Sequence, residues 1–154
     1  MNKKIYFISF IFFIIDLISK QIIVHTMNLY ESIKVINNFF YITYTRNTGA
    51  AFSILEDSRM LLLIITVFAL FFINKYMNKE KIKGILVLSY SMIIGGILGN
   101  LFDRVVFGYV IDFLDFKIFG YNYPIFNFAD TFIVIGAIIM IIDSILKEYI
   151  WKKK

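Results

Sequence analysis

The 154-residue chain contains no cysteine, one histidine and one proline, and charged residues make up only 18% of it. The lack of cysteine excludes disulfides, thiolate nucleophiles and thiolate metal sites, and a single histidine excludes multi-histidine metal centres. Hydrophobic residues account for 60% of the chain and aromatic residues for 19%, whereas a soluble domain has about 45–50% apolar residues. This composition excludes a water-soluble globule and a disordered chain, so lipid must surround much of the protein.

Four apolar blocks are candidates for membrane-spanning helices, each of which requires about 20 mostly apolar residues. We expect these helices at about 5–24, 58–77, 84–102 and 128–148. The second block is the shortest, and it reaches the required length only if Lys75 extends its charged end toward the membrane surface. The sequence therefore predicts a protein that crosses the membrane four times.

The first block has a second interpretation, because a basic start followed by an apolar run is also typical of a secretory signal sequence. Asp16 and Lys20 interrupt the run, however, and no small-residue cleavage site follows it. We therefore expect this block to remain as a helix of the mature protein.

Between the first two predicted helices, residues 39–45 are rich in aromatic and β-branched side chains, which is typical of a strand. The aromatic side chains either lie at the level of the lipid headgroups or hold a lipid-bearing ligand against the bilayer. The expected fold is an all-α integral membrane protein with four transmembrane helices and a small extracytoplasmic β-sheet. We expect residues 1–154 to form one membrane domain.

Basic residues in short loops favour the cytoplasmic side of a membrane. Ten of the 16 lysine and arginine residues fall on one side of the predicted helices, so we expect both termini in the cytoplasm and the loops 25–57 and 103–127 outside. The net charge is +5, but the lysines border apolar blocks and do not form a basic face, so we expect no nucleic-acid partner. The ten residues are Lys3, Lys4, Lys75, Lys79, Lys81, Lys83, Lys147, Lys152, Lys153 and Lys154.

Ionisable residues in membrane-spanning segments are costly and are therefore candidate functional residues. Asp16 and Lys20 lie four residues apart, on one face of the first helix, where they can neutralise each other. Asn100, Asp103 and Arg104 likewise share one face at the end of the third helix. Each group has two interpretations: an ion pair that stabilises the helices, such as Arg104 with Asp103, or part of a functional site.

Two further aspartates lie among apolar residues at the outer side of the predicted bundle. Asp112 follows Val110 and Ile111, and Asp130 begins the fourth helix, where helix capping is the simpler explanation. Two carboxylates in one apolar site cannot both ionise easily, so one keeps a proton and the other can act as a base. Such a pair can activate water for attack on an amide carbonyl without a metal or cofactor. Spacing alone leaves Asp103 and Asp115 as rival members of the pair.

In their order and spacing these residues resemble the signal peptidase II family, also called lipoprotein signal peptidases. These bacterial inner-membrane aspartyl proteases remove signal peptides from lipid-modified prolipoproteins. Single motifs are weak, but four of them in sequence are specific. They match Asp16 and Lys20, then Asn47-Thr48-Gly49-Ala50-Ala51-Phe52, then Gly99-Asn100, Asp103-Arg104, Gly108 and Val110-Ile111-Asp112-Phe113, and finally Pro124, Phe126-Asn127 and Ala129-Asp130.

The resemblance implies that Asp112 and Asp130, and not Asp103 or Asp115, are the catalytic residues. It implies a substrate with a diacylglyceryl-modified cysteine, cleavage just before that cysteine, and inhibition by globomycin-type compounds. It also implies a multi-pass protein of the bacterial cell membrane with its active site near the outer face and no cofactor, and we expect a monomer. The supporting residues implied around the active site are Asp16, Lys20, Asn47, Gly49, Asn100, Arg104, Asn127 and Ala129.

Two departures from the family pattern are modest. Thr131 stands where serine is usual, and residues 119–123 lack the tryptophan often found before the proline.

Two other classes of function compete with the protease. A small transporter or channel would use the buried charges as an ion path, but the second and fourth helices have no polar stripe through their centres. A membrane scaffold would need no aspartate pair.

Overall fold

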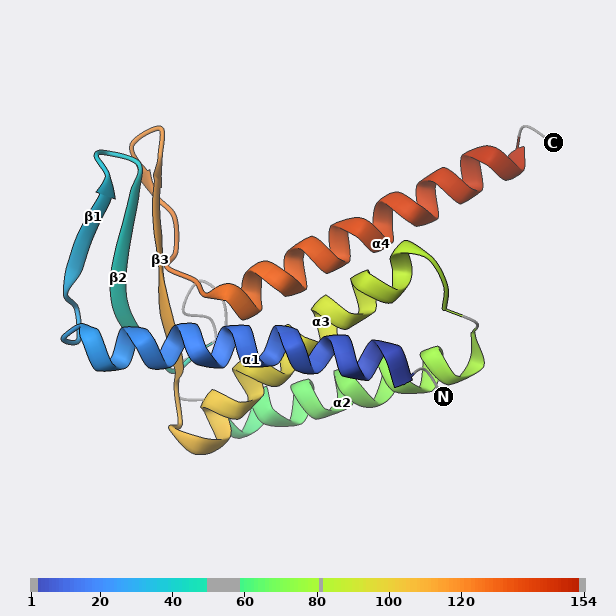
Figure 1. Cartoon of the computed structure of the whole chain (residues 1–154), viewed down its shortest axis with the longest axis horizontal. Helices are drawn as coiled ribbons and strands as arrows, with labels where there is room; N and C mark the ends of the chain where they lie inside the picture. The colour runs from blue at the N-terminus through green and yellow to red at the C-terminus, as the bar shows by residue number, and fades with distance from the viewer. Residues whose placement is uncertain (1–2, 50–58, 81, 153–154) are drawn as a thin grey trace.

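The computed structural model describes residues 3–49, 59–80 and 82–152, which form four long helices and one four-stranded sheet (Figure 1). This confirms the predicted fold class. The helices are α1 (Lys3–Thr26), α2 (Arg59–Lys79), α3 (Ile85–Val106) and α4 (Phe128–Lys152). The strands are β1 (Ser32–Ile36), β2 (Phe40–Asn47), β3 (Val110–Ile118) and β4 (Tyr121–Asn122).

All four helices are long and apolar enough to cross a membrane, within the described part of the chain. Large apolar side chains are exposed on their outer faces, including Phe68 and Phe71 on α2 and Ile138 and Ile141 on α4. In water such surfaces would be unfavourable, but lipid is as apolar as these side chains. The chain is therefore a multi-pass membrane protein.

α3 is the central helix of the bundle. Within an apolar 18-residue stretch of α3, 56% is buried inside the protein, whereas only 11% of the corresponding stretch is buried in α2 and in α4. Glycine makes this close packing possible. For example, a Cβ on Gly96 would overlap the backbone carbonyl of Ala129 on α4, and one on Gly99 would overlap the carboxylate of Asp16 on α1. Both α1 and α4 therefore pack closely against the polar C-terminal part of α3.

The antiparallel sheet lies across one end of the bundle in the order β1-β2-β3-β4, and both chain termini lie at the other end (Figure 1). Beneath the sheet, Ile23 of α1 and Met27, which directly follows this helix, pack against Tyr44, Ile111 and Phe113. This apolar cluster anchors β2 and β3 to the helices.

The predicted strand at 39–45 is part of β2, but the region around Asp112, which we expected as loop, is the longest strand of the sheet, β3. In the pairing of β2 with β3, Thr45 lies opposite Asp112 and Asn47 opposite Val110. Residues 50–52 of the second motif lie outside the described residues, so only its first part is placed.

Candidate functional site

Asp112 and Asp130 meet where the sheet joins the helices. Asp112 is 2% exposed and lies on β3 between the buried side chains of Ile111 and Phe113. Asp130 lies in the first turn of α4, and it is partly buried. The strand and the helix terminus therefore carry the two carboxylates to one place.

Asn127, directly before α4, binds both carboxylates. Its side-chain Nδ2 donates to Asp112 Oδ1 at 2.6 Å, and its backbone N–H donates to Asp130 Oδ2 at 3.3 Å. In return, the backbone N–H of Asp130 donates to Asn127 Oδ1 at 2.9 Å. This reciprocal pattern resembles a helix cap, but the same asparagine also reaches across to the sheet. Helix capping and site formation are therefore performed by the same residues.

The remaining carboxylate oxygens bind two further asparagines. Asn47 Nδ2 donates to Asp112 Oδ2 at 3.0 Å, while Asn47 Oδ1 accepts from the backbone N–H of Gly49 at 2.9 Å. Asn100 Nδ2 donates to Asp130 Oδ1 at 2.7 Å. Each oxygen of the pair thus accepts a hydrogen bond, which holds both carboxylates in defined orientations.

The pKa of Asp112 is raised from the ordinary value of 3.8 to about 7. Burial is the main cause, because it disfavours the charged carboxylate, and the nearby negative charge of Asp130 adds to the effect. Hydrogen bonds from Asn47 and Asn127 oppose the increase. Near neutral pH, Asp112 can therefore hold a proton.

A second group of charges, fully buried, lies next to this pair. Lys20 Nζ lies 2.7 Å from Asp16 Oδ2 and 3.0 Å from Asp103 Oδ2, and it also donates to Asn100 Oδ1 at 3.1 Å. Asp16 Oδ1 accepts from the backbone N–H of Ala129 at 2.8 Å. We call Asp16, Lys20 and Asp103 the ion cluster; it connects α1, α3 and α4.

The structure separates the two rival aspartates from the pair. Asp103 belongs to the ion cluster, where its Oδ2 also accepts from the backbone N–H of Ile111 at 3.1 Å. Asp115 lies further along β3 and accepts a hydrogen bond from Thr43 Oγ1 at 2.7 Å. In the described part of the chain, Asp112 and Asp130 are the aspartates that line the large cavity of about 940 Å³.

Arg104 has different partners from those considered above. Its Nη2 donates to the backbone carbonyl of Gly49 at 3.0 Å and its Nη1 to that of Asn100 at 3.4 Å. Among the described residues it forms no ion pair with Asp103, whose charge is matched by Lys20 instead. Of the two interpretations of Arg104, the structure does not show the ion pair with Asp103, because Asp103 is buried in the ion cluster and Arg104 lines the cavity.

The cavity combines polar and apolar walls. Asn47, Asn100 and Arg104 line it beside the two carboxylates, and the apolar side chains include Phe39, Phe116, Phe126, Ile133 and Val134. Such a site can hold a peptide bond against the carboxylates and an apolar group beside it. In the described part of the chain, no group of three or more histidine, cysteine or acidic side chains is arranged to hold a metal ion.

Arg46 also lines the cavity, although the sequence motifs did not point to it. Its guanidinium lies 4.7 Å from the ring centroid of Tyr109, and its Nε donates to Tyr44 Oη at 3.1 Å. The sequence offered one signal for a role of Arg46: this arginine lies in an aromatic strand, directly before Asn47 of the second motif.

Comparison with known proteins shows which family the chain belongs to. The family model described as Signal peptidase (SPase) II matches residues 8–146. The chain belongs to the signal peptidase II family. A lipoprotein signal peptidase from Halothermothrix orenii is 41% identical over 150 residues, which cover 97% of each chain.

Two solved structures, each described as a bacterial membrane enzyme, have the same fold as this signal peptidase II family member. The first, at 2.3 Å resolution, has a TM-score of 0.88 with 37% identity and covers 97% of this chain and 91% of its own. The second, at 1.9 Å resolution, has a TM-score of 0.80 with 37% identity and covers 94% of both chains. Family and fold together make this protein a membrane peptidase.

Proposed function

We propose that this peptidase removes the signal peptide from diacylglyceryl-modified prolipoproteins by hydrolysing the bond just before the lipidated cysteine. The observation that carries this proposal is that Asp112 and Asp130 bind one asparagine, Asn127, and line one cavity. Two carboxylates held in this way can perform acid–base hydrolysis of an amide.

The pair shares one proton at rest, and the burial of Asp112 favours that carboxyl as its carrier. Asp130 accepts a proton from a water molecule as the water oxygen attacks the scissile carbonyl carbon. Asp112 donates its proton to the carbonyl oxygen, which forms a neutral tetrahedral diol. The diol then collapses: the C–N bond breaks, the leaving amine takes a proton from Asp130, and a hydroxyl proton returns to Asp112. Both carboxyls end in their starting states.

The surrounding residues support this chemistry by holding the two carboxylates in position. Asn47, Asn100 and Asn127 hold the carboxylate oxygens, and Arg104 fastens the Gly49 carbonyl to α3. The ion cluster positions them in turn, because Asp16 binds the backbone of Ala129 directly before Asp130, and Lys20 binds Asn100. These contacts give Asp16, Lys20, Asn47, Gly49, Asn100, Arg104, Asn127 and Ala129 their proposed supporting roles.

The apolar part of the cavity suits a lipid-modified substrate. Ile133 and Val134 lie on α4, whose neighbouring side chains face the membrane, so acyl chains can remain in lipid while the peptide reaches Asp130. Globomycin-type inhibitors would occupy the same cavity. A purified enzyme should therefore cleave a lipidated prolipoprotein peptide and leave its unlipidated counterpart uncut; equal cleavage of both would contradict the proposed substrate.

Asparagine variants test the pair itself. Asp112→Asn or Asp130→Asn should each lower the turnover of the lipidated peptide by at least about 10³-fold, because asparagine keeps the shape but cannot exchange the proton. The double variant should be scarcely worse than either single variant, since the two residues act as a unit. Asp115→Asn is the matched control and should retain activity. Near-normal turnover in either single variant, with the protein folded, would refute the pair.

We also propose that both termini are cytoplasmic and that the site lies near the outer face. The sheet with Lys34 and the helix end with Lys79 lie at opposite ends of the bundle (Figure 1). A single cysteine introduced at position 34 should react with an impermeant thiol reagent in whole cells, and one at position 79 should not. The reverse labelling pattern would overturn this orientation.

A further inference from the structure

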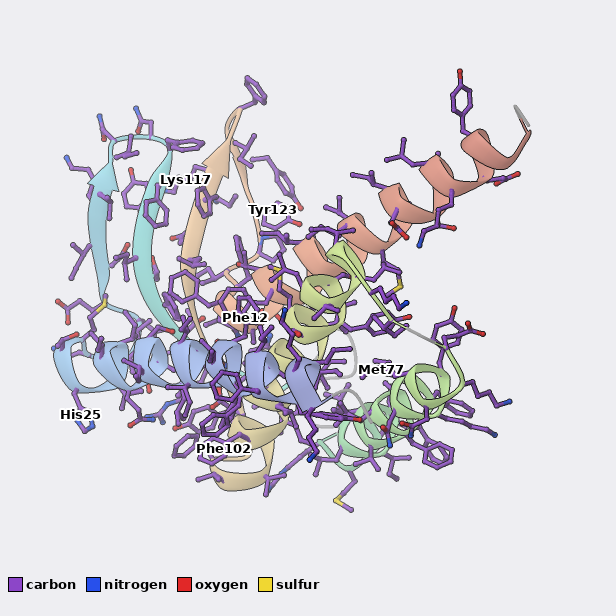
Figure 2. The ribbon with its side chains drawn as sticks, turned by 45° about the vertical axis from the view of Figure 1, so that its right-hand side comes forward. Phe12, His25, Met77, Phe102, Lys117 and Tyr123 are labelled. Atoms are coloured by element: carbon purple, nitrogen blue, oxygen red, sulfur yellow. The ribbon has the colours of Figure 1, made fainter. Side chains whose placement is uncertain are left out.

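A second cavity, of about 490 Å³, lies between α2, α3 and α4. It is formed at the end of the bundle where the chain termini lie, away from the sheet (Figure 1). Figure 2 shows Met77 on this side of the molecule and Lys117 and Tyr123 on the side of the sheet. The cavity is lined by Phe72, Ile73, Lys75, Tyr76 and Lys79 of α2, Tyr90 of α3 and Met140 of α4. We call this the α2 groove.

The groove exists because α2 packs lightly on the bundle. Of the described α2 side chains, only Leu62 and Met77 are buried. Met77 packs with Tyr90 of α3, and the Tyr76 and Tyr90 rings stack with their centroids 6.3 Å apart. The wall beyond these rings is apolar and open, and it continues into the exposed face of α2 at Phe72.

Two positive charges lie over this apolar wall. Lys75 and Lys79 are four residues apart on one face of α2, an arrangement in which like charges repel each other. Within the described residues, neither lysine forms an ion pair with a carboxylate. Asp143 of α4 is engaged by Lys147 at 2.6 Å, and the exposed Glu80 lies close enough to Tyr90 to interact with it electrostatically but does not line the groove. The groove therefore has an excess positive charge beside an apolar channel.

We propose that the α2 groove binds one anionic phospholipid, with its phosphate between Lys75 and Lys79 and an acyl chain along Phe72 and Met140. Charge complementarity selects the phosphate, since basic pockets between transmembrane helices bind anionic headgroups. The apolar wall favours a lipid over a free anion, because an acyl chain joined to the phosphate can pack along the wall, whereas a free anion makes no contact with it. Tyr76 lies where the two regions meet, as tyrosine does at membrane interfaces.

Native mass spectrometry of the full chain in detergent tests this site, because it counts single bound lipids. The protein is mixed with equal amounts of dioleoyl phosphatidylglycerol and dioleoyl phosphatidylcholine, and we expect adducts of the anionic lipid to predominate. Each lysine beside an anionic headgroup contributes about fivefold in affinity, so Lys75→Gln combined with Lys79→Gln should weaken phosphatidylglycerol binding about 30-fold. Lys75→Arg with Lys79→Arg should retain it.

Lys3→Gln with Lys4→Gln is the matched control, since it removes the same charge from the same end of the protein without touching the groove. This control should change binding by less than about threefold. Equal loss in both glutamine pairs would show general attraction and overturn the site, as would equal binding of the two lipids. Displacement of the lipid by an equal concentration of inorganic phosphate would assign the lysines to a free anion and overturn the lipid site. No substrate is present, so the result is independent of the proposed peptidase mechanism.

Discussion

The hydrogen bond from Asn47 to Asp112 allows a quantitative test of the proposed mechanism. Asn47 Nδ2 donates to Asp112 Oδ2 at 3.0 Å and lowers the pKa of that carboxyl by stabilising its charged form. Leucine has nearly the shape of asparagine but no hydrogen-bond donor. Asn47→Leu should therefore raise the pKa of Asp112 above its value of about 7.

The size of the change follows from the strength of the bond. A hydrogen bond to a charged group contributes about 1.5–3 kcal/mol, and one pKa unit corresponds to about 1.4 kcal/mol. The pKa of Asp112 should thus rise by about one to two units in the variant. Because the mechanism needs Asp112 protonated, activity falls as pH rises through this pKa, so the falling limb of the pH profile should move upward by the same amount.

The measurement is kcat/KM for a lipidated prolipoprotein peptide across the pH range, with the parent enzyme and Asn47→Leu compared under identical conditions. Thr43→Val is a matched control, because it removes the hydrogen bond to Asp115 on the same strand and should leave the falling limb in place. A limb that stays fixed in Asn47→Leu, or moves to lower pH, would refute the assignment of the proton to Asp112.

Two other substitutions test the surroundings of the pair. Arg104→Ala should lower kcat/KM by about 10- to 100-fold with the protein still folded, because it releases the Gly49 carbonyl and removes a positive charge from the cavity; unchanged cleavage rates would assign Arg104 a dispensable role. Lys20→Met should destabilise the protein by about 3–5 kcal/mol in a detergent unfolding assay, since it leaves Asp16 and Asp103 buried without a counter-charge; an unchanged unfolding midpoint would contradict the energetic role of the ion cluster.

Local sequence was enough to establish that the protein lies in a membrane and crosses it with four helices. Hydropathy is a sum over neighbouring residues, so it needs no knowledge of tertiary contacts. The strand at residues 39–45 was also visible in local composition, whereas the strand β3 was not, because its burial comes from packing on α1. The resemblance of the motifs pointed to the family, and the comparisons showed it.

Which polar groups meet, in contrast, depends on the tertiary structure. Spacing left Asp103 and Asp115 equal to Asp112, yet Asp103 pairs with Lys20 and Asp115 binds Thr43. Spacing also left open whether Arg104 pairs with Asp103, whereas in the folded chain it donates to the Gly49 carbonyl.

The physical reason is that these partners lie far apart along the chain. Lys20 and Asn100, which share a hydrogen bond, are separated by 80 positions. A one-residue change of strand register would turn Asp112 to the opposite face of the sheet. Such contacts exist only in the folded chain, where α3, packed closely through Gly96 and Gly99, brings α1 and α4 together.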